Sequence, residues 1–182
     1  MMTGILLLSF LLTGCGSQEP QTGKKMSMYY INTAETKVEV HEQYLNTKTL
    51  DEQLDETMRY LSTTPEKLEY KAPLDMGFRV LDYEVEDGKL LINVDKAYSE
   101  LSPTTEVLVR AAIVRTLTQL PNVKYVGITV EDSQLYDNAG EMVGWMNADQ
   151  FINNDGNEIN TYELVKVKLY FANAAGDKLI AS

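Results

Sequence analysis

Apolar side chains recur at helical spacing between residues 50 and 61. They would form one stripe along a helix, with acidic and basic side chains on the other side. The stripe consists of Leu50, Leu54, Met58 and Leu61. Thr49 and Glu52 stand at the N-cap and N3 positions of a capping box, in which each side chain accepts a hydrogen bond from the other residue's amide. The pattern predicts a first amphipathic helix.

A second apolar stripe lies between residues 103 and 120. Ser102 and Pro103 precede it as N-cap and first helical residue, a position where proline loses no hydrogen bond. Pro121 follows the stripe and cannot continue a helix. Its members are Val109, Ala112, Ile113, Thr116, Leu117 and Leu120. We therefore expect a second amphipathic helix.

Aromatic and aliphatic runs predict the strands. Met28-Tyr29-Tyr30-Ile31 indicates a first strand, and Tyr125–Val130 indicates the last. The stretch from the first strand to about Lys48 is interpreted as a polar connection with some extended character at Val38 and Val40.

A hairpin is predicted over residues 78–95. Asp87-Gly88 lies between two alternating runs, which is the strongest short-range hairpin signal. Leu81, Tyr83 and Val85 share one side of the first arm, and the core-facing residues of the second arm are Leu90, Ile92 and Val94. The order strand, helix, hairpin, helix, strand predicts an α+β domain over residues 26–150, with both amphipathic helices on one face of a small mixed sheet.

The first residues predict export. Residues 4–12 are uncharged but too few to span a membrane, which takes roughly 20 apolar residues. Leu12-Thr13-Gly14-Cys15 resembles the lipobox of bacterial lipoproteins, in which the cysteine receives a diacylglyceryl group before cleavage. This resemblance implies a signal peptide over 1–14, lipid on Cys15, a flexible tether over 15–25, and a location on the extracytoplasmic face of the cell membrane. The alternative is a core segment that ends in cysteine.

The charge excludes one class of partner. The chain of 182 residues has a net charge of −11, whereas nucleic acid is bound by clustered Lys and Arg. The same charge opposes adhesion to anionic lipid, so the acyl chains would hold the protein at the membrane. Cys15 is the only cysteine, so the mature domain has no internal disulfide.

Candidate ligands for a metal ion or a cofactor are sparse. We expect neither a bound metal ion nor a cofactor. His41 is the only histidine, and a lone histidine in an acidic loop is more often solvated than functional. The run from Asn153 to Glu158 resembles a calcium loop, yet Phe151 and Tyr162 stand where ligands 1 and 12 are needed. We interpret residues 151–162 as a turn-rich linker.

Three carboxylates and one aromatic segment are the remaining candidates. Asp132, Asp137 and Glu141 could approach one another, but a solvated face is favoured over an acid–base pair because no perturbing partner is evident. The segment from Met142 to Met146 holds Trp145, the only tryptophan. It closes the core or displays a binding patch, and core closure is favoured. No catalytic residue is assigned, so we expect no enzyme.

Several segments together resemble the GerMN family, found in sporulation and spore-germination lipoproteins and other exported proteins of Gram-positive bacteria. They are the Tyr29-Tyr30 strand, the Val80–Asp95 hairpin, and Leu108–Pro121 running into Val123–Val126. The resemblance implies a compact unit like the ring-building modules of secretion and sporulation assemblies, with two helices on a three-stranded sheet. It brings no catalytic residues.

The leading hypothesis is a membrane-tethered, non-catalytic interaction or scaffold domain with protein partners in the cell envelope, in a sporulation or germination setting. Self-association is a further option. The alternative is a lipoprotein that binds cell-wall glycan or a small ligand, suggested by the 11 tyrosines. A hydrolase that depends on Asp132 and Asp137 ranks lowest.

The C-terminal residues resemble the start of the same domain. Residues 28–38 align without a gap on residues 169–179, with four of 11 positions identical. We expect residues 163–182 to begin an incomplete second GerMN-like repeat. The alternative is that Glu163–Phe171 docks on the first domain as an added strand.

Overall fold

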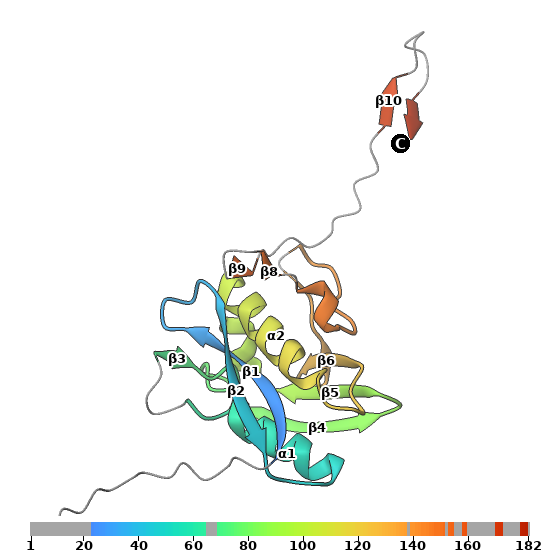
Figure 1. Ribbon diagram of the computed structural model, residues 1–182. Coiled ribbons are helices and arrows are strands. Elements are labelled where there is room, and N and C mark those ends of the chain that lie inside the picture. Colours follow the sequence, from blue (N-terminus) through green and yellow to red (C-terminus); the bar gives the residue numbers. More distant parts are fainter. Residues whose placement is uncertain are drawn as a thin grey trace, which may run out of the picture.

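A computed structural model describes residues 23–64, 69–137 and 139–151, and beyond these the backbone of four short strands (Figure 1). The two α-helices are α1 (Leu50–Leu61) and α2 (Pro103–Leu117), and the two 3-10 helices are η1 (Lys96–Glu100) and η2 (Ala148–Gln150). The strands of the main body are β1 (Lys24–Asn32), β2 (Val38–Leu45), β3 (Tyr70–Lys71), β4 (Val80–Glu86), β5 (Lys89–Val94), β6 (Tyr125–Val130) and β7 (Ser133–Gln134). The short strands after residue 151 are β8 (Asn153–Asn154), β9 (Glu158–Ile159), β10 (Tyr170–Ala172) and β11 (Leu179–Ala181).

The strands of the main body form two sheets, so the α+β class is confirmed while the expected single mixed sheet is divided. The first sheet has the order β2-β1-β3, and the second has the order β4-β5-β6-β7. Only β5 and β6 run parallel. The division arises because β1 pairs along its length with β2, the segment interpreted above as a polar connection.

Both helices begin at the predicted caps. The Glu52 amide donates to Thr49 Oγ1 at 3.4 Å and the Thr49 amide to Glu52 Oε2 at 3.2 Å, which completes the capping box. The Thr105 amide donates to Ser102 Oγ at 3.2 Å. Leu50 lies in the first turn of α1 and is 39% exposed, whereas the three later members of its stripe are buried. No helix among the described residues is long and apolar enough to cross a membrane.

Helix α2 is buried on all sides, so the prediction that it is amphipathic is wrong. From Leu108 to Leu117 every residue except Arg115 is buried. The reason is that α2 contacts β1 and β2 of the first sheet as well as β6 of the second. A helix with partners on several sides is expected to be apolar around its circumference.

The one buried cation of α2 has a local partner. Arg110 Nε lies 2.7 Å from Glu106 Oε1, one helical turn earlier. The hydroxyl of Tyr98, from η1, donates to the same carboxylate at 2.9 Å. Burial raises the pKa of Tyr98 well above its usual value, with a further contribution from the Glu106 charge. The Glu106 carboxylate therefore joins η1 to α2 through Tyr98, and it compensates the charge of Arg110 in the core.

The side chains of Thr116 in α2 and of Gln119, two residues after the end of α2, complete the edge of β1 that β3 leaves open. The Ser27 amide donates to Gln119 Oε1 at 3.0 Å, and Gln119 Nε2 donates to the Ser27 carbonyl at 2.7 Å. The Tyr29 amide donates to Thr116 Oγ1 at 3.0 Å. The Gln119 amide thus takes the place of a neighbouring strand, so these backbone groups are satisfied without one.

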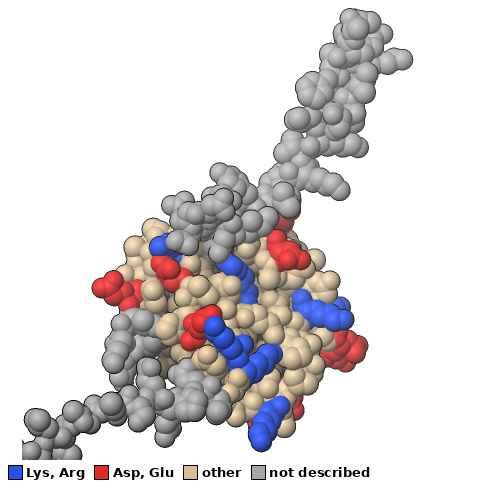
Figure 2. Space-filling view, viewed as in Figure 1, with Lys and Arg blue, Asp and Glu red and all other residues tan. Residues whose placement is uncertain are grey.

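The other edge of the first sheet is β2. Ion pairs join Lys25 to Glu42 at 2.6 Å and Lys37 to Glu39 at 2.7 Å, so the β2 glutamates have cationic partners. The face shown in Figure 2 carries Lys and Arg interspersed with Asp and Glu.

The hairpin forms with the predicted turn, but its first arm is less buried than expected. Asp87 and Gly88 have φ values of 50° and 80°, as a two-residue turn of this kind requires. The residues of the second arm that were predicted to face the core are buried. In β4, Leu81 is 49% exposed and Val85 39% exposed, because β4 is an edge strand and the register shifts between Val80 and Asp82. Tyr83 is half-buried.

The hairpin of β10 and β11 repeats the pairing of β1 and β2. Tyr170 faces Ala181 and Ala172 faces Leu179, and the residues 141 positions earlier in each strand face one another in the same way. Strand β10 pairs with β11, and no pairing of β10 with the two sheets of the main body is seen among the described residues.

Replacing Gln119 with methionine should lower the free energy of unfolding by about 1–3 kcal/mol. Methionine matches the length of glutamine but leaves the Ser27 amide and carbonyl unsatisfied. Chemical denaturation measures the change. Gln134→Met, on an exposed side chain of β7, is the matched control and should have little effect. Equal stability of both variants would show that Gln119 does not support β1.

Candidate functional site

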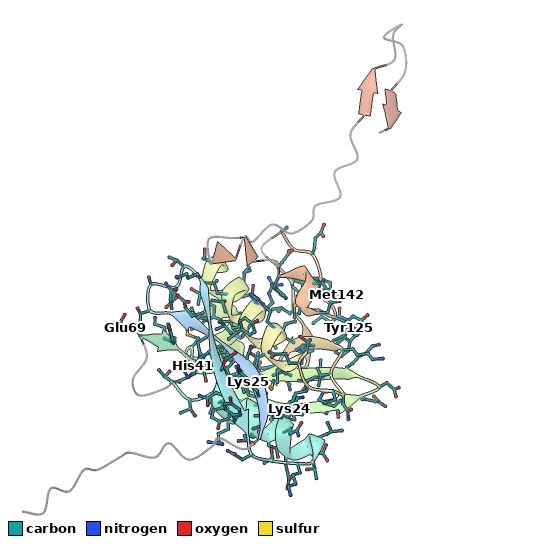
Figure 3. All side chains as sticks on the ribbon, viewed as in Figure 1. Lys24, Lys25, His41, Glu69, Tyr125 and Met142 are labelled. Carbon is teal, nitrogen blue, oxygen red and sulfur yellow. The ribbon has the colours of Figure 1, made fainter. Side chains whose placement is uncertain are left out.

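The residues singled out from the sequence do not form one site. Cys15 lies outside the described residues. His41 lies within β2, not in a loop as predicted, because residues 38–45 are extended along β1. It is half-buried, and its ring centroid is 6.5 Å from that of Tyr30 in an edge-on arrangement (Figure 3 labels His41).

Two of the three carboxylates, those of Asp132 and Asp137, accept hydrogen bonds from different partners. Asp132 Oδ1 accepts a hydrogen bond from Asn93 Nδ2 at 2.7 Å. Asp137 Oδ1 accepts from the backbone amides of Ala139 and Glu141, at 2.9 and 2.8 Å. These contacts fix turns. In the part of the chain that the structure describes, no group of three or more His, Cys, Asp or Glu could hold a metal ion.

The predicted linker contains two short strands. Asn153 pairs with Ile159 and Asn154 with Glu158. Residues 155–157, the centre of the calcium-like run, lie outside the described residues. The prediction that this run is not a calcium site therefore remains untested.

The segment with the only tryptophan has two roles. Met146 is 3% exposed and forms an antiparallel bridge with Val126, with two backbone hydrogen bonds of 2.8 Å. Core closure is therefore confirmed for Met146. It is wrong for Trp145, which is 43% exposed, because consecutive residues of an extended segment point to opposite sides.

Trp145 lies on the outer face of the second sheet. The inner positions of β5 and β6 are buried against the core, so the intervening positions point outward. The outer face consists of Asp82, Glu84 and Glu86 on β4, Lys89, Leu91 and Asn93 on β5, and Tyr125, Gly127 and Thr129 on β6. Figure 3 labels Tyr125, and also Met142, which belongs to the segment that crosses this face.

A glycine in β6 makes room for the tryptophan ring. A Cβ atom added to Gly127 would lie 2.8 Å from Trp145 Cζ3 and 3.0 Å from Cε3, closer than real Cβ contacts allow. The indole therefore rests directly on the backbone of β6. Lys89 Nζ lies 5.3 Å from the centre of the same ring, within the range of a cation–π interaction.

Two hollows flank the indole, and both are lined by Leu91 and Trp145. The first, of about 250 Å³, is also lined by Glu84, Glu86, Asp87 and Lys89. The second, of about 120 Å³, is mostly apolar and includes Leu135 and Met142 among its lining residues. Small-molecule pockets typically measure about 300–1,000 Å³, so both hollows fit single side chains better than a whole ligand.

Acidic side chains beside the first hollow have no ion pair within the part of the chain that the structure describes. We call Asp82, Glu84 and Glu86 of β4 the acidic row. Asp82 accepts a hydrogen bond from Asn93 at 3.1 Å, whereas the carboxylates of Glu84 and Glu86 have no ion pair or hydrogen bond within the described residues. Lys89 is the cross-strand neighbour of Glu86, but its ammonium is placed over Trp145.

Two sequence signals could have indicated this face. Alternate acidic residues in a strand place their charges on one side, and the run from Asp82 to Glu86 has that pattern. A glycine inside a strand, here Gly127, often marks a close approach of another group. Neither signal identifies Trp145 as that group.

Replacing Gly127 with alanine should displace the indole and shift tryptophan emission to longer wavelength, because the added methyl group occupies the space of the ring. We expect a loss of about 1–3 kcal/mol in unfolding free energy from the overpacking. Ser133→Ala, at an exposed position of β7 in the same sheet, is the control and should change neither emission nor stability appreciably. Unchanged emission in the Gly127 variant would contradict the observed packing.

Comparisons with known proteins identify the domain. A family model named Germane, described as sporulation and spore germination, matches residues 27–136. A search of curated proteins finds no match. Among solved structures, the tandem GerMN domains of the sporulation protein GerM from Bacillus subtilis match with a TM-score of 0.52 and 17% identity, over 82% of this chain and 50% of that one.

The first GerMN domain of the same Bacillus subtilis protein matches with a TM-score of 0.51 and 14% identity, over 66% of this chain and 94% of that one. The chain thus spans about half the length of the tandem structure. At these identities the structural likeness shows the fold alone, whereas the family model covers more than half of the sequence. The chain belongs to the Germane family of sporulation and spore-germination domains, as the GerMN resemblance predicted.

Proposed function

We propose that this protein is a lipid-anchored, extracytoplasmic lipoprotein whose GerMN domain is a non-catalytic interaction or scaffold domain, acting in sporulation or spore germination. The observation that carries the proposal is family membership combined with an exposed sheet face that carries Trp145 and the acidic row. The two hollows on that face are smaller than typical small-molecule pockets. Asp132 and Asp137, the two residues of the hydrolase alternative, accept hydrogen bonds from Asn93 and from the amides of Ala139 and Glu141.

The anchor is supported by the lipobox-like residues 12–15 and by the short distance in sequence to the domain. Strand β1 begins at Lys24, eight residues after Gly16. As a flexible coil, such a tether has a root-mean-square reach of about 16 Å. The domain would then stay close to the membrane, where partners in the envelope are within reach.

The described tyrosines give limited support to the alternative of glycan binding. It came from the number of tyrosines, but Tyr30 and Tyr98 are buried, and burial raises the pKa of Tyr30 to about 12. Tyr29 lies beneath Arg115, with 4.2 Å from the guanidinium carbon to the ring centroid. Only Tyr125 and Tyr136 of the described tyrosines are strongly exposed. The structure thus supplies no broad aromatic surface for sugars among these residues.

We also propose that residues 163–182 begin a second GerMN-like repeat, after a linker over 151–162. The support is the shared register of the two hairpins, since strand pairs recur at an offset of 141 residues. The similarity to a tandem pair of GerMN domains is consistent with such an arrangement.

Hydrogen exchange on the full chain tests the repeat. Amides of β10 and β11 should exchange rapidly, because a two-stranded hairpin without the rest of its domain is marginally stable in water. Amides of β1 and β2 serve as the internal control and should exchange slowly, since that pair belongs to a packed sheet. Slow exchange in β10 would instead favour docking on the first domain.

Cell fractionation with chemical cross-linking tests the anchor and the interaction role. The native protein should be found in the membrane fraction, cross-linked to envelope proteins. Cys15→Ser should leave the membrane or persist as an unprocessed precursor, because a hydroxyl cannot carry the thioether-linked lipid. Ser17→Ala keeps the lipobox-like residues and should behave as the native protein.

Two outcomes would contradict these proposals separately. A processed Cys15→Ser protein in the membrane fraction would remove the lipid anchor. Recovery of the native lipoprotein without any cross-linked protein, under several cross-linking chemistries, would remove the interaction role.

A further inference from the structure

Strand β4 is a long edge strand whose pairing side remains open. It lies at the end of the order β4-β5-β6-β7, and its only strand partner among the described residues is β5. It spans seven residues, whereas β7, at the other end of the sheet, spans two. A row of unpaired backbone amides and carbonyls is a template for another strand.

The two sides of β4 differ in chemistry. Its outward side carries the acidic row of Asp82, Glu84 and Glu86, all exposed. Its inward side carries Tyr83 and Val85, and Val85 remains 39% exposed although its cross-strand neighbour Leu90 is buried. The apolar side of β4 is therefore only partly covered.

The negative charge of β4 determines which kind of strand could pair with its open edge. Charged side chains on an edge strand normally hinder pairing, and like charges directly opposite one another destabilise a strand pair. A second copy of β4 is therefore disfavoured. A strand with cations opposite Glu84 and Glu86 is favoured, because these carboxylates have no cationic partner within the described part of the chain.

The edge of the other sheet shows the contrast. Strand β2 also carries glutamates, but Glu39 and Glu42 form ion pairs with Lys37 and Lys25. The charges of β2 are thus compensated within the domain, and those of β4 are not. This difference points to β4 as the edge with an external partner.

We propose that an extended protein segment with alternating basic and apolar residues adds to the edge of β4 as a further strand. Its backbone pairs with β4, its Lys or Arg side chains lie beside the acidic row, and its apolar side chains cover Tyr83 and Val85. Alternate side chains of a strand repeat every 6–7 Å or so, the spacing of the acidic row itself. The hollow of about 250 Å³ beside Trp145 receives the end of one basic side chain.

This inference rests on the proposed interaction role and names the chemistry of the partner. Strand addition gives affinity through main-chain hydrogen bonds and specificity through alternate side chains. Main-chain pairing can be removed by a change in the peptide, and charge complementarity can be removed by a change in the protein.

The test measures binding of a fluorescent synthetic peptide of alternating lysine and leucine to the full chain, by anisotropy. The native protein should bind it, and emission of Trp145, the only tryptophan, should change as the hollow fills. The double variant Glu84→Gln, Glu86→Gln should bind about tenfold more weakly, a change of about 1.4 kcal/mol. A peptide N-methylated at alternate residues should not bind, because it cannot pair with a strand edge.

A charge-matched variant separates site binding from general attraction to an acidic protein. Glu69→Gln with Glu100→Gln removes the same two charges from exposed positions outside β4 and should bind the peptide as the native protein does. Thermal melting confirms that both double variants remain folded.

Four results would overturn the inference: no binding of the basic peptide, equal weakening by both double variants, undiminished binding of the N-methylated peptide, or displacement of the peptide by soluble peptidoglycan fragments. Each can occur while cross-linking still captures envelope proteins, so failure here is distinguishable from failure of the interaction role.

Discussion

The burial of α2 between two sheets is the constraint on which the rest of the structure depends. Its residues from Leu108 to Leu117 face β1 on one side and β6 on another, with only Arg115 left partly exposed. Ala111 and Ala112 keep the helix narrow at its centre. Each sheet therefore contributes one face to the helix. For the second sheet, this leaves the face with Leu91 and Gly127 outside the core, where Trp145 covers part of it.

Two buried polar residues of α2, Arg110 and Thr116, lie against partners from the helix itself and from β1. Arg110 is 7% exposed and lies against Glu106, which also accepts from Tyr98. Removing one member of such a buried pair leaves an uncompensated charge and typically costs about 3–5 kcal/mol. Thr116 is fully buried, and its hydroxyl serves the Tyr29 amide. These polar residues join η1 and β1 to the helix, so α2 connects segments far apart in the sequence.

Features set by neighbours in the chain could be predicted, and features set by distant partners could not. The capping box of Thr49 and Glu52, the cap at Ser102 and the turn at Asp87-Gly88 each depend on a few adjacent residues, and all three form as expected. Burial of Arg110 depends on partners in the tertiary structure, so a stripe on one face of the helix that left out Arg110 underestimated how much of α2 is enclosed.

Strand β2 escaped prediction for a related reason. Apolar and polar residues alternate from Val38 to His41, but Glu42 breaks the alternation and two apolar residues, Tyr44 and Leu45, end the strand, so the strand pattern is weak. Pairing with β1 is what makes it a strand. The single expected sheet followed from this omission, since β1 without β2 had no partner except the hairpin.

Only part of the outer face of the second sheet can be predicted from neighbouring residues in the sequence. The alternation of Asp82, Glu84 and Glu86 and the glycine at 127 are visible in the sequence. The position of Trp145 is set by Met146, whose bridge to Val126 fixes the segment across β6 and turns the adjacent indole onto Gly127. A single core contact thus determines which aromatic residue is displayed.

The described strands supply no partner for the open edge of β4, although two short antiparallel pairs follow the main body, β8 with β9 and β10 with β11. Strands β8 and β9 read Asn-Asn and Glu-Ile and contain no cation. Strand β11 reads Leu-Ile-Ala and β10 reads Tyr-Phe-Ala, so neither offers a cation to the acidic row. Both strands are also engaged with each other, in the register of β1 and β2. A repeat that begins with this hairpin would form its own first sheet before any strand equivalent to β4 appears. The basic strand that we propose for the β4 edge would therefore come from outside the described strands.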